Sequence, residues 1–351
     1  MLRSQIKTPA LLVDMDAMEA NLCEMAAFFA EGPTQLRPHY KNHKCVALAR
    51  RQLAHGAVGI TCATLGEAEA LSRSGIQGIL LANEIASPTQ IERFVQIARV
   101  TDIMVGVDNE RTVSALSAAS AQAKVPLSVL VDVDTGMGRC GALPGAPALA
   151  LAEQAVAQGL SLRGLIGYEG HCVRLEPGPA KIEAVQQAMG KLVGTANLIR
   201  SHGLAVEIVS AGGTGTYSIS GRIPGVTEIQ GGSYLLMDTG YQAICPDFDL
   251  ALSVLGTVIS RTGNQRFILD IGLKEISAER GLPVLKNTGG AQLRKLNAEH
   301  AIVEILDPNL TVQVGDQLEL WAHYSDCTVN LHRHMFGIRN GQVEETFLLE
   351  S

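Results

Sequence analysis

A lysine stands in the segment of the chain that is richest in reactive side chains, Arg37–Lys44. A predicted β-strand passes into a helix at this point, so Lys41 follows the end of an apolar strand. Two histidines and an arginine of the same segment flank it. Cationic neighbours and partial burial favour the neutral amine that attacks a carbonyl group. Lys44 is the alternative nucleophile, but we expect it inside the following helix and therefore expect Lys41 to be a Schiff-base lysine.

Two glycine-rich segments follow later strands and could hold a phosphate. Ser210–Thr216 offers backbone N–H groups and hydroxyls with little steric obstruction. It lacks the Gly-Lys-Ser/Thr ending of a nucleotide loop, which argues against ATP or GTP. Gln230–Tyr234 follows the next strand, and barrels often build phosphate sites from two such neighbouring loops. A positioned amine and a phosphate cradle together predict pyridoxal 5'-phosphate (PLP).

An arginine lies on a tight glycine turn within Asp132–Gly141. In one interpretation Arg139 forms a structural salt bridge with Asp132 or Asp134. In the other, its permanent charge contacts the phenolate oxygen of the cofactor and tunes the ring. The position at a strand end favours the cofactor contact.

The segment His323–His334 near the C-terminus is rich in possible metal ligands. Histidine with a carboxylate or a thiolate at close spacing can hold a divalent metal. From composition alone, a polar loop is the simpler interpretation.

The elements that would position these residues alternate regularly along the first two thirds of the chain. Short apolar β-rich runs are separated by helical stretches whose starts carry caps. Thr64–Glu67 is a capping box, and Ser87–Gln90 has proline at the first helical position. This pattern predicts a (β/α)8 barrel with its functional residues at the carboxyl ends of the strands. The eight predicted strands are Gln35–Tyr40, Val58–Ala63, Gly78–Ala82, Asp102–Val107, Leu127–Val133, Ser161–Tyr168, Glu207–Ser210 and Thr227–Gln230.

From about residue 245 the pattern changes to short alternating strands with Gly, Asn and Asp turns. We predict a barrel domain over residues 15–244 and a smaller antiparallel β-domain over residues 245–351, which the N-terminal strand 8–14 may join. The strands predicted for this domain are Leu250–Arg261, Arg266–Asp270, Ala301–Leu306, Gln317–Leu320 and Gly341–Leu348.

Composition limits the function classes. The chain has 351 residues, 46% hydrophobic and 18% charged, with a net charge of −7. These values describe a compact acidic enzyme and argue against a nucleic-acid or membrane-surface partner. No run is long enough to span a membrane, and the N-terminus has no apolar signal core. Seven cysteines without CxxC spacing favour reduced thiols and a cytoplasmic location.

With these residues laid out, the chain resembles the D-threonine aldolase and D-serine dehydratase group, PLP enzymes with an alanine-racemase-like N-terminal barrel. The resemblance covers nearly the whole chain. The lysine motif and the C-terminal segment are its most specific parts, and the glycine loops are less so. The segments that carry it are Thr8–Asp14, Arg37–Lys44, Tyr168–His171, Gly212–Thr216, Asp270–Lys274, Glu299–His300 and Thr328–Leu331.

The resemblance implies roles for individual residues. Lys41 would be the Schiff-base lysine, Arg139 would lie near the cofactor phenolate, and Tyr168 would line the cofactor pocket. His39 and His171 are candidates for proton handling, although either could be a core histidine. The remaining cofactor-binding residues would come from the two glycine loops: Ser210, Gly213, Thr214, Gly215, Gly232, Ser233 and Tyr234.

The resemblance also implies a divalent metal held by His323 and a second ligand close after it. Aldolases of the group look like His-x-Asp followed by Pro-Thr-Val-Asn, and dehydratases look like His-x-Cys. This chain has one residue more between histidine and aspartate. Alignment on Thr-Val-Asn favours Asp326, with Cys327 in the place of the proline, and Cys327 stays the alternative ligand. We expect Mn2+ or Mg2+, with Zn2+ as the alternative.

The function expected from the resemblance is a PLP- and metal-dependent lyase of D-β-hydroxy-α-amino acids. The reaction that we favour is retro-aldol cleavage to glycine and an aldehyde. The alternative is a D-serine or 3-hydroxyaspartate dehydratase, which gives a 2-keto acid and ammonia. A racemase and a non-catalytic PLP-binding protein rank lower. The expected partners are a small amino-acid substrate and a second copy of the chain in a homodimer.

Overall fold

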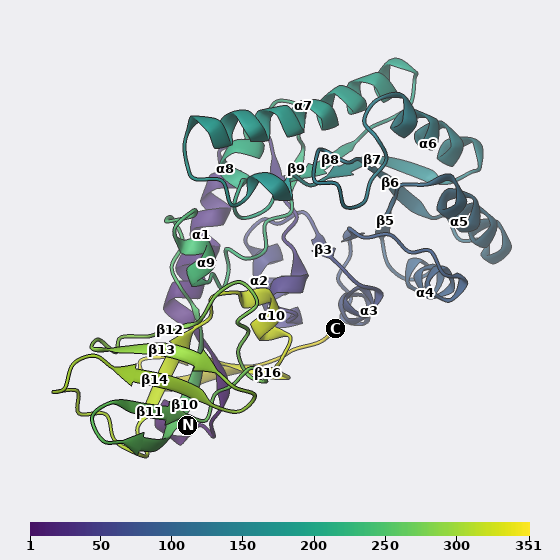
Figure 1. The fold of residues 1–351 in the computed structure, drawn as a ribbon. Helices are drawn as coiled ribbons and strands as arrows, with labels where there is room; N and C mark the ends of the chain where they lie inside the picture. The colour runs from purple at the N-terminus through teal and green to yellow at the C-terminus, as the bar shows by residue number, and fades with distance from the viewer. The chain divides into compact units, whose positions relative to one another are not determined.

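The computed structural model describes residues 1–351 and divides the chain into two compact units (Figure 1). Unit 1 contains Met1–Glu24, Asn42–Ala47 and Ser233–Leu349. Unit 2 contains the rest of the chain. Its segments are Met25–Lys41, Leu48–Gly232 and Glu350–Ser351.

Unit 2 is built on an eight-stranded parallel sheet. Its hydrogen-bonded order is β2-β9-β8-β7-β6-β5-β4-β3. A parallel bridge between His39 and Thr61, and a 2.9 Å bond from Val58 N–H to the Leu36 carbonyl, join the two ends of this order. The sheet therefore curls into the (β/α)8 barrel that the sequence predicted. The strands are β2 (Gln35–Leu36), β3 (Ile60–Cys62), β4 (Ile79–Leu81), β5 (Ile103–Val107), β6 (Ser128–Asp132), β7 (Ser161–Gly167), β8 (Ile208–Ala211) and β9 (Glu228–Ile229).

Helices follow the strands and lie on the outer side of the sheet (Figure 1). Pro88 lies in the first turn of its helix, as predicted, and Ser87 also forms a capping box with Gln90. Thr64 accepts from the N–H of Glu67 at 3.2 Å and starts the preceding helix. The Glu67 carboxylate, however, accepts from the Ala63 N–H at 2.7 Å, so its return bond reaches the residue before the expected capping-box partner. The helices are α3 (Leu65–Arg73), α4 (Pro88–Ala98), α5 (Glu110–Ala123), α6 (Ala146–Ala157), α7 (Pro179–Ser201) and α8 (Tyr217–Ser220); α1 (Met15–Ala30) and α2 (Val46–Ala54) each divide between the units.

Apolar side chains fill the inside of the barrel. Five neighbouring strands each contribute one member of a buried cluster, and burying such a side chain stabilises the fold by roughly 1.5–3 kcal/mol. The members are Leu80, Met104, Leu130, Ile166 and Ile208.

A buried ion pair lies beside the seam between β2 and β9. Arg37 donates to both carboxylate oxygens of Glu228, from Nε at 2.8 Å and from Nη2 at 2.9 Å. A further guanidinium nitrogen donates to the Gly78 carbonyl. We expected Arg37 to be one of the cations that tune Lys41. Its charge is instead neutralised by Glu228, so this part of the sequence argument was wrong.

Unit 1 contains a mostly antiparallel sheet with the path β13-β14-β11-β10-β1-β16-β17, and β15 pairs with β10 and β12. The predicted N-terminal strand joins it: β1 (Ala10–Asp14) pairs antiparallel with β10 and parallel with β16. Leu12 and Leu255 pack together in its core with Ile6 and Ala10. The remaining strands are β10 (Leu252–Thr262), β11 (Arg266–Leu269), β12 (Val284–Leu285), β13 (Ala291–Leu296), β14 (Ala301–Ile305), β15 (Gln317–Trp321), β16 (His334–Arg339) and β17 (Gln342–Leu348).

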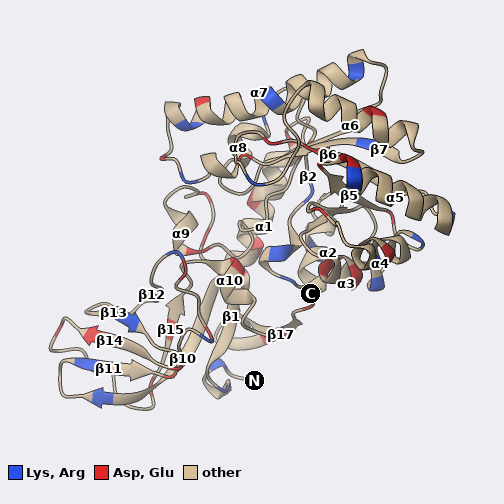
Figure 2. Cartoon of the chain, turned by 45° about the vertical axis from the view of Figure 1, so that its right-hand side comes forward, with Lys and Arg blue, Asp and Glu red and all other residues tan.

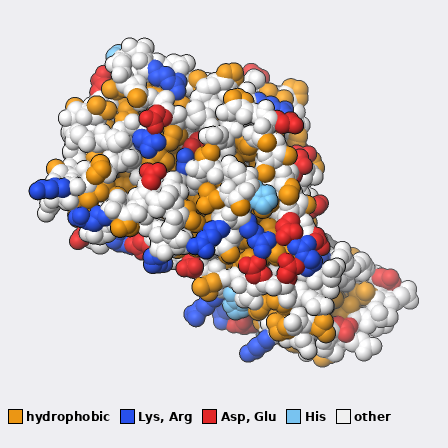
Figure 3. Space-filling model, turned by 180° about the vertical axis from the view of Figure 1, so that it is seen from behind, with side chains coloured by type: hydrophobic (Ala, Val, Ile, Leu, Met, Phe, Trp, Pro, Cys, Tyr) orange, Lys and Arg blue, Asp and Glu red, His pale blue; other side chains and the backbone are white.

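Two short helices in unit 1 carry residues of interest, α9 (Thr239–Gln242) and α10 (Ser325–Val329). Acidic and basic residues alternate along both units in the cartoon of Figure 2, and the face in Figure 3 shows acidic and basic side chains in the same mixture. None of the helices combines the length and the apolar character that crossing a bilayer requires.

Candidate active site

Lys41 lies in a short 3₁₀ turn, Tyr40–Asn42, that follows the β2 edge of the barrel. Its neighbours fix the backbone on this side. The N–H of His39 donates to the Gly231 carbonyl at 3.2 Å, and the buried Tyr40 hydroxyl donates to the Glu350 carbonyl at 3.0 Å. Lys41 itself is half-buried. The structure therefore places this amine at a rigid strand end, as a cofactor-linking lysine requires.

Lys44, the alternative lysine, is not part of a helix. It precedes α2 in a left-handed conformation, with φ of 49°. Its Nζ donates to the Asn330 side-chain oxygen at 2.5 Å. The expectation that Lys44 lies within the helix was wrong, because a left-handed turn delays the helix start to Val46. The hydrogen bond nevertheless gives Lys44 a structural role.

The first glycine loop needs its glycines. Gly212 has φ of 73°, and a Cβ there would lie 2.8 Å from the Ile229 side chain. A Cβ on Gly213 would lie 3.2 Å from the Tyr168 ring. A side chain at either position would collide with Ile229 or press against Tyr168, so the loop after β8 needs glycine to pack this closely.

Sequence reasoning missed the residue that holds this loop, Glu169. It is fully buried and accepts from the Gly212 N–H at 3.1 Å, from the Thr216 hydroxyl at 2.6 Å and from the Ser220 hydroxyl at 2.5 Å. The only signal in the sequence was a carboxylate at the end of an apolar strand. Glu169 is therefore the anchor that gives the cradle its shape.

The second glycine loop approaches the first loop and the lysine strand. Gln230 donates to the Ser210 hydroxyl at 2.9 Å, and Gly231 lies beside Thr214. A Cβ on Gly232 would lie 2.7 Å from the His39 carbonyl oxygen. Unit 2 therefore brings together Ser210, Thr214 and Gly232 of the predicted phosphate site.

The last two residues predicted for that site belong to unit 1. The Ser233 carbonyl accepts from the Met237 N–H at 2.8 Å. Tyr234 is fully buried, and its ring centroid lies 5.7 Å from that of Phe248. Within unit 1, Tyr234 is thus a packed core aromatic.

Arg139 lies over the face of Tyr168, with its guanidinium carbon 5.8 Å from the ring centroid. The loop that carries it is shaped by Asp134, which accepts from the N–H groups of Gly136 at 2.9 Å and Gly138 at 3.1 Å. These bonds hold the pKa of Asp134 below its usual range. The Asp134 carboxylate therefore stabilises the turn that follows it, and the Arg139 guanidinium lies against the Tyr168 ring.

A second acidic residue of this loop was not given a role by sequence reasoning. The pKa of Asp132 is raised to about 8, chiefly by burial and then by a hydrogen bond to Glu84 and the charges of Glu84 and Asp108. The three carboxyl groups come from the carboxyl ends of β6, β4 and β5. Asp132 can therefore hold a proton near neutral pH at the barrel end that carries the cofactor residues.

His171 and Lys191 meet the same loop from the other side. A Cβ on Gly136 would lie 3.3 Å from the His171 Nε2 and 3.2 Å from the Lys191 Nζ. Lys191 donates to the Thr135 carbonyl at 3.0 Å. His171 is exposed, which allows proton exchange with solvent, whereas His39 is buried.

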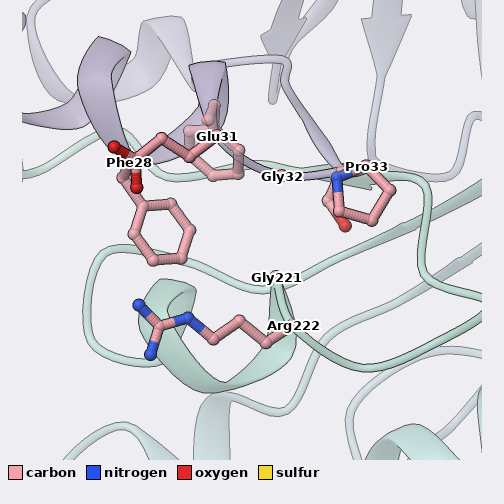
Figure 4. A pocket seen from close by; sticks show the side chains of 8 residues that line it. Phe28, Glu31, Gly32, Pro33, Gly221 and Arg222 are labelled. Atoms are coloured by element: carbon pink, nitrogen blue, oxygen red, sulfur yellow. The ribbon is translucent and has the colours of Figure 1, made fainter.

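A cavity of about 290 Å³ in unit 2 lies at the other end of the strands (Figure 4). It is lined by Phe28 at the end of α1, by the segment 31–34 that leads into β2, and by Arg222, which precedes β9. The Arg222 guanidinium lies 5.1 Å from the Phe28 ring centroid. Because these residues come before the strands, the cavity is distinct from the cofactor residues.

The predicted metal ligands lie around the start of α10 in unit 1. Buried Asp238 fixes this start by accepting from the Ser325 N–H at 2.8 Å and the Ser325 hydroxyl at 2.9 Å. The Asp326 Oδ1 accepts from the Asn42 amide at 2.7 Å, and the Tyr324 hydroxyl lies 3.4 Å from its Oδ2.

His323 has a different partner from Asp326. Its Nδ1 lies 2.8 Å from the Thr239 hydroxyl, and a Cβ on Gly281 would lie 2.6 Å from its ring. Donation from Nδ1–H leaves the Nε2 lone pair for a metal, which is the usual arrangement of a ligating histidine. No group of three or more His, Cys, Asp or Glu side chains is arranged to hold an ion.

Cys327, the alternative ligand, is hydrogen-bonded to the carboxylate of Glu279. Its thiol donates to the Glu279 side chain at 3.5 Å. Burial raises the pKa of Cys327, and this hydrogen bond raises it further. Cys327 is thus hydrogen-bonded to a residue other than the predicted ligands. A divalent cation accepts an imidazole nitrogen and a carboxylate oxygen, so His323 and Asp326 have the donor chemistry that the predicted site requires.

Comparison with known proteins identifies the family of this chain. The family model of the alanine racemase N-terminal domain matches residues 13–239, and that of a putative serine dehydratase domain matches residues 251–338. D-threonine aldolase of Arthrobacter sp is 38% identical over 97% of this chain and 92% of its own. 3-Hydroxy-D-aspartate aldolase of Paracoccus denitrificans (strain Pd 1222) is 33% identical over 97% of this chain and 91% of its own.

A dehydratase is also among the relatives. D-threo-3-hydroxyaspartate dehydratase of Delftia sp. (strain HT23) is 32% identical over 79% of this chain and 74% of its own. Among solved structures, D-threonine aldolase from Filomicrobium marinum superposes with a TM-score of 0.95 at 34% identity, covering 99% of this chain and 95% of the other. The chain therefore belongs to the D-threonine aldolase and D-serine dehydratase-like family, and it is a PLP-dependent lyase.

Proposed function

We propose that this protein cleaves D-β-hydroxy-α-amino acids by a retro-aldol reaction into glycine and an aldehyde. The observation that carries the proposal is the contrast between the two possible metal ligands. Asp326 is held by Asn42, whereas the Cys327 thiol is bound to Glu279. A carboxylate in this place corresponds to the aldolase pattern, and a thiolate corresponds to the dehydratase pattern.

We assign the cofactor to unit 2. Lys41 would bind its aldehyde carbon, Arg139 its phenolate oxygen and Tyr168 its ring. When bound, PLP supplies an electron sink for the negative charge that bond cleavage leaves on Cα. The phosphate would be held by Ser210, Gly213, Thr214, Gly215 and Gly232 of unit 2.

We assign a divalent cation, Mn2+ or Mg2+, to His323 and Asp326. When bound, such a cation supplies Lewis acidity toward the substrate hydroxyl. His171, exposed at the loop after β7, would accept the proton that leaves this hydroxyl. Lys41 is the base when the α-proton is removed instead, as in a dehydratase. His39 would position the second glycine loop, because its carbonyl oxygen packs closely against Gly232.

Product analysis tests the proposal. The PLP-loaded protein is incubated with Mn2+ and with the D- and L-forms of threonine, serine, phenylserine and 3-hydroxyaspartate, with and without EDTA. We expect glycine and an aldehyde from D-forms only, lost on chelation and in Asp326→Ala but retained in Cys327→Ala. Ammonia and a 2-keto acid, lost in Cys327→Ala, would replace the aldolase by the dehydratase.

We further propose a homodimer in the cytoplasm. All seven cysteines are free, which suits a reducing compartment. Size-exclusion chromatography with light scattering tests the assembly: a mass near twice 37.2 kDa supports the dimer, and a mass near the single-chain value contradicts it.

A further inference from the structure

One polar side chain near the proposed cation is only partly satisfied. Asn42 is 1% exposed. Its amide nitrogen donates to the Asp326 Oδ1 at 2.7 Å and to the Ser325 hydroxyl oxygen at 2.8 Å. Its amide oxygen is buried and has no hydrogen-bond partner. A buried acceptor without a donor costs about 1–3 kcal/mol, so this arrangement needs a reason.

Rotating the amide would not repair it. The Ser325 hydroxyl donates its single hydrogen to Asp238 and can only accept from Asn42. The Asp326 carboxylate also only accepts. An exchanged amide would therefore place its oxygen against two acceptors. The surroundings fix the amide nitrogen toward Asp326 and leave the oxygen for a donor that the protein does not supply.

The bond to Asp326 is not needed to start α10. Asp238 already anchors Ser325 through two hydrogen bonds. A second tether joins the same loop to the end of the helix, because Lys44 donates to Asn330. The contact that distinguishes Asn42 from these tethers is its contact with the proposed metal ligand.

We propose that Asn42 is a positioning residue of the cation site: its amide nitrogen orients Asp326, and its amide oxygen accepts from a water molecule bound to the cation. This inference rests on the proposed function. Mn2+ and Mg2+ keep several waters when few protein ligands are present, and such waters are donors. The cation would thereby supply the hydrogen bond that the buried oxygen lacks. Partners that orient a metal ligand typically change metal affinity by about 10–100-fold.

The test is Mn2+ affinity of the PLP-loaded protein, measured by the EPR signal of free Mn2+ during titration. Asn42→Ala is compared with Asn330→Ala, which removes the other tether of the same loop without touching Asp326. Asn42→Ser, whose hydroxyl is too short to reach both partners, serves if the alanine variant folds poorly. The visible absorbance of the cofactor and the thermal unfolding midpoint are recorded for each variant.

We expect the Kd for Mn2+ to rise about 10–100-fold in Asn42→Ala and Asn42→Ser, with cofactor absorbance retained, and to change less than about twofold in Asn330→Ala. Equal losses in the Asn42 and Asn330 variants would reduce the role of Asn42 to a loop tether and overturn the inference. If Asp326→Ala loses Mn2+ binding while Asn42→Ala keeps the wild-type affinity, the inference about Asn42 is overturned and the proposed metal site stands. A wild-type protein that binds no Mn2+ would overturn the proposed metal dependence, and the inference with it.

Discussion

Asp132 makes the stability of this protein depend on pH in an unusual direction. Its pKa in the folded chain is about 8, chiefly because of burial and secondly because of Glu84, against about 3.9 for an unfolded aspartate. Between these values the folded chain holds a proton that the unfolded chain has released. Folding then takes up a proton. The free energy of unfolding is therefore highest at about pH 4 and below, and it falls as the pH rises from 4 to 8.

The magnitude follows from the difference of about four pH units, which corresponds to at most roughly 6 kcal/mol above pH 8. Structural relaxation and water entry reduce the cost of burying a charge, so we expect a loss of about 2–4 kcal/mol between pH 5 and pH 8.5. Asp132→Asn keeps the shape and removes the titration. The variant should lose less stability than the wild type over this range, by about the same 2–4 kcal/mol.

The assay is urea unfolding of both proteins at fixed PLP concentration, at several pH values from 5 to 8.5. Asp134→Asn provides a control without a slope in this range. Backbone N–H groups lower the pKa of Asp134, so its contribution to stability is fully present from pH 5 to 8.5 and is lost only below about pH 4. That variant should be destabilised by the same amount at every pH tested, with a profile parallel to that of the wild type. Parallel wild-type and Asp132→Asn profiles between pH 5 and 8.5 would refute the reasoning.

Three further predictions concern single residues. Lys41→Ala should abolish turnover and the lysine-linked absorbance band of the cofactor; an unchanged spectrum and activity would contradict its assignment. Glu169→Ala leaves two buried hydroxyls and the Gly212 N–H without their acceptor, and should cost roughly 2–4 kcal/mol in denaturant unfolding and weaken PLP binding in a fluorescence titration. Glu228→Ala leaves the buried Arg37 charge unpaired and should cost about 3–5 kcal/mol. In calorimetry, a loss below about 1 kcal/mol would show that water reaches this guanidinium.

The barrel could be predicted because its signals are local. Each strand is a short apolar run, and helix starts such as Ser87–Gln90 carry capping residues within four positions. The strand at Ala10–Asp14 was predicted for the same reason. Strand β13 (Ala291–Leu296) was missed because only Leu293 and Leu296 are buried in it, one on each side of a register shift. That shift breaks the alternation by which a strand is recognised.

Pairings between distant residues could not be predicted. Arg37 and Glu228 are separated by 191 positions, and nothing near Arg37 in the sequence indicates its partner. The same limit applies to Glu169, whose three donors lie 43 to 51 positions downstream. The left-handed turn at Lys44 was hidden for a different reason, since lysine carries no signal for positive φ.

In the metal segment, the sequence separation of the two predicted ligands, His323 and Asp326, is one residue longer than in the aldolase pattern. Sequence alignment treated His323 and Asp326 as two ligands separated by an insertion. In the structure the separation is set by the helix start: His323 precedes α10 and contacts Thr239, whereas Asp326 lies in the first turn and contacts Asn42. Tyr324 and Ser325 lie between them in the sequence, and the Tyr324 hydroxyl lies 3.4 Å from the Asp326 carboxylate. Ligand geometry here therefore depends on Asp238, which fixes Ser325 as the first helical residue, and a change at Asp238 should alter cation binding without altering either ligand.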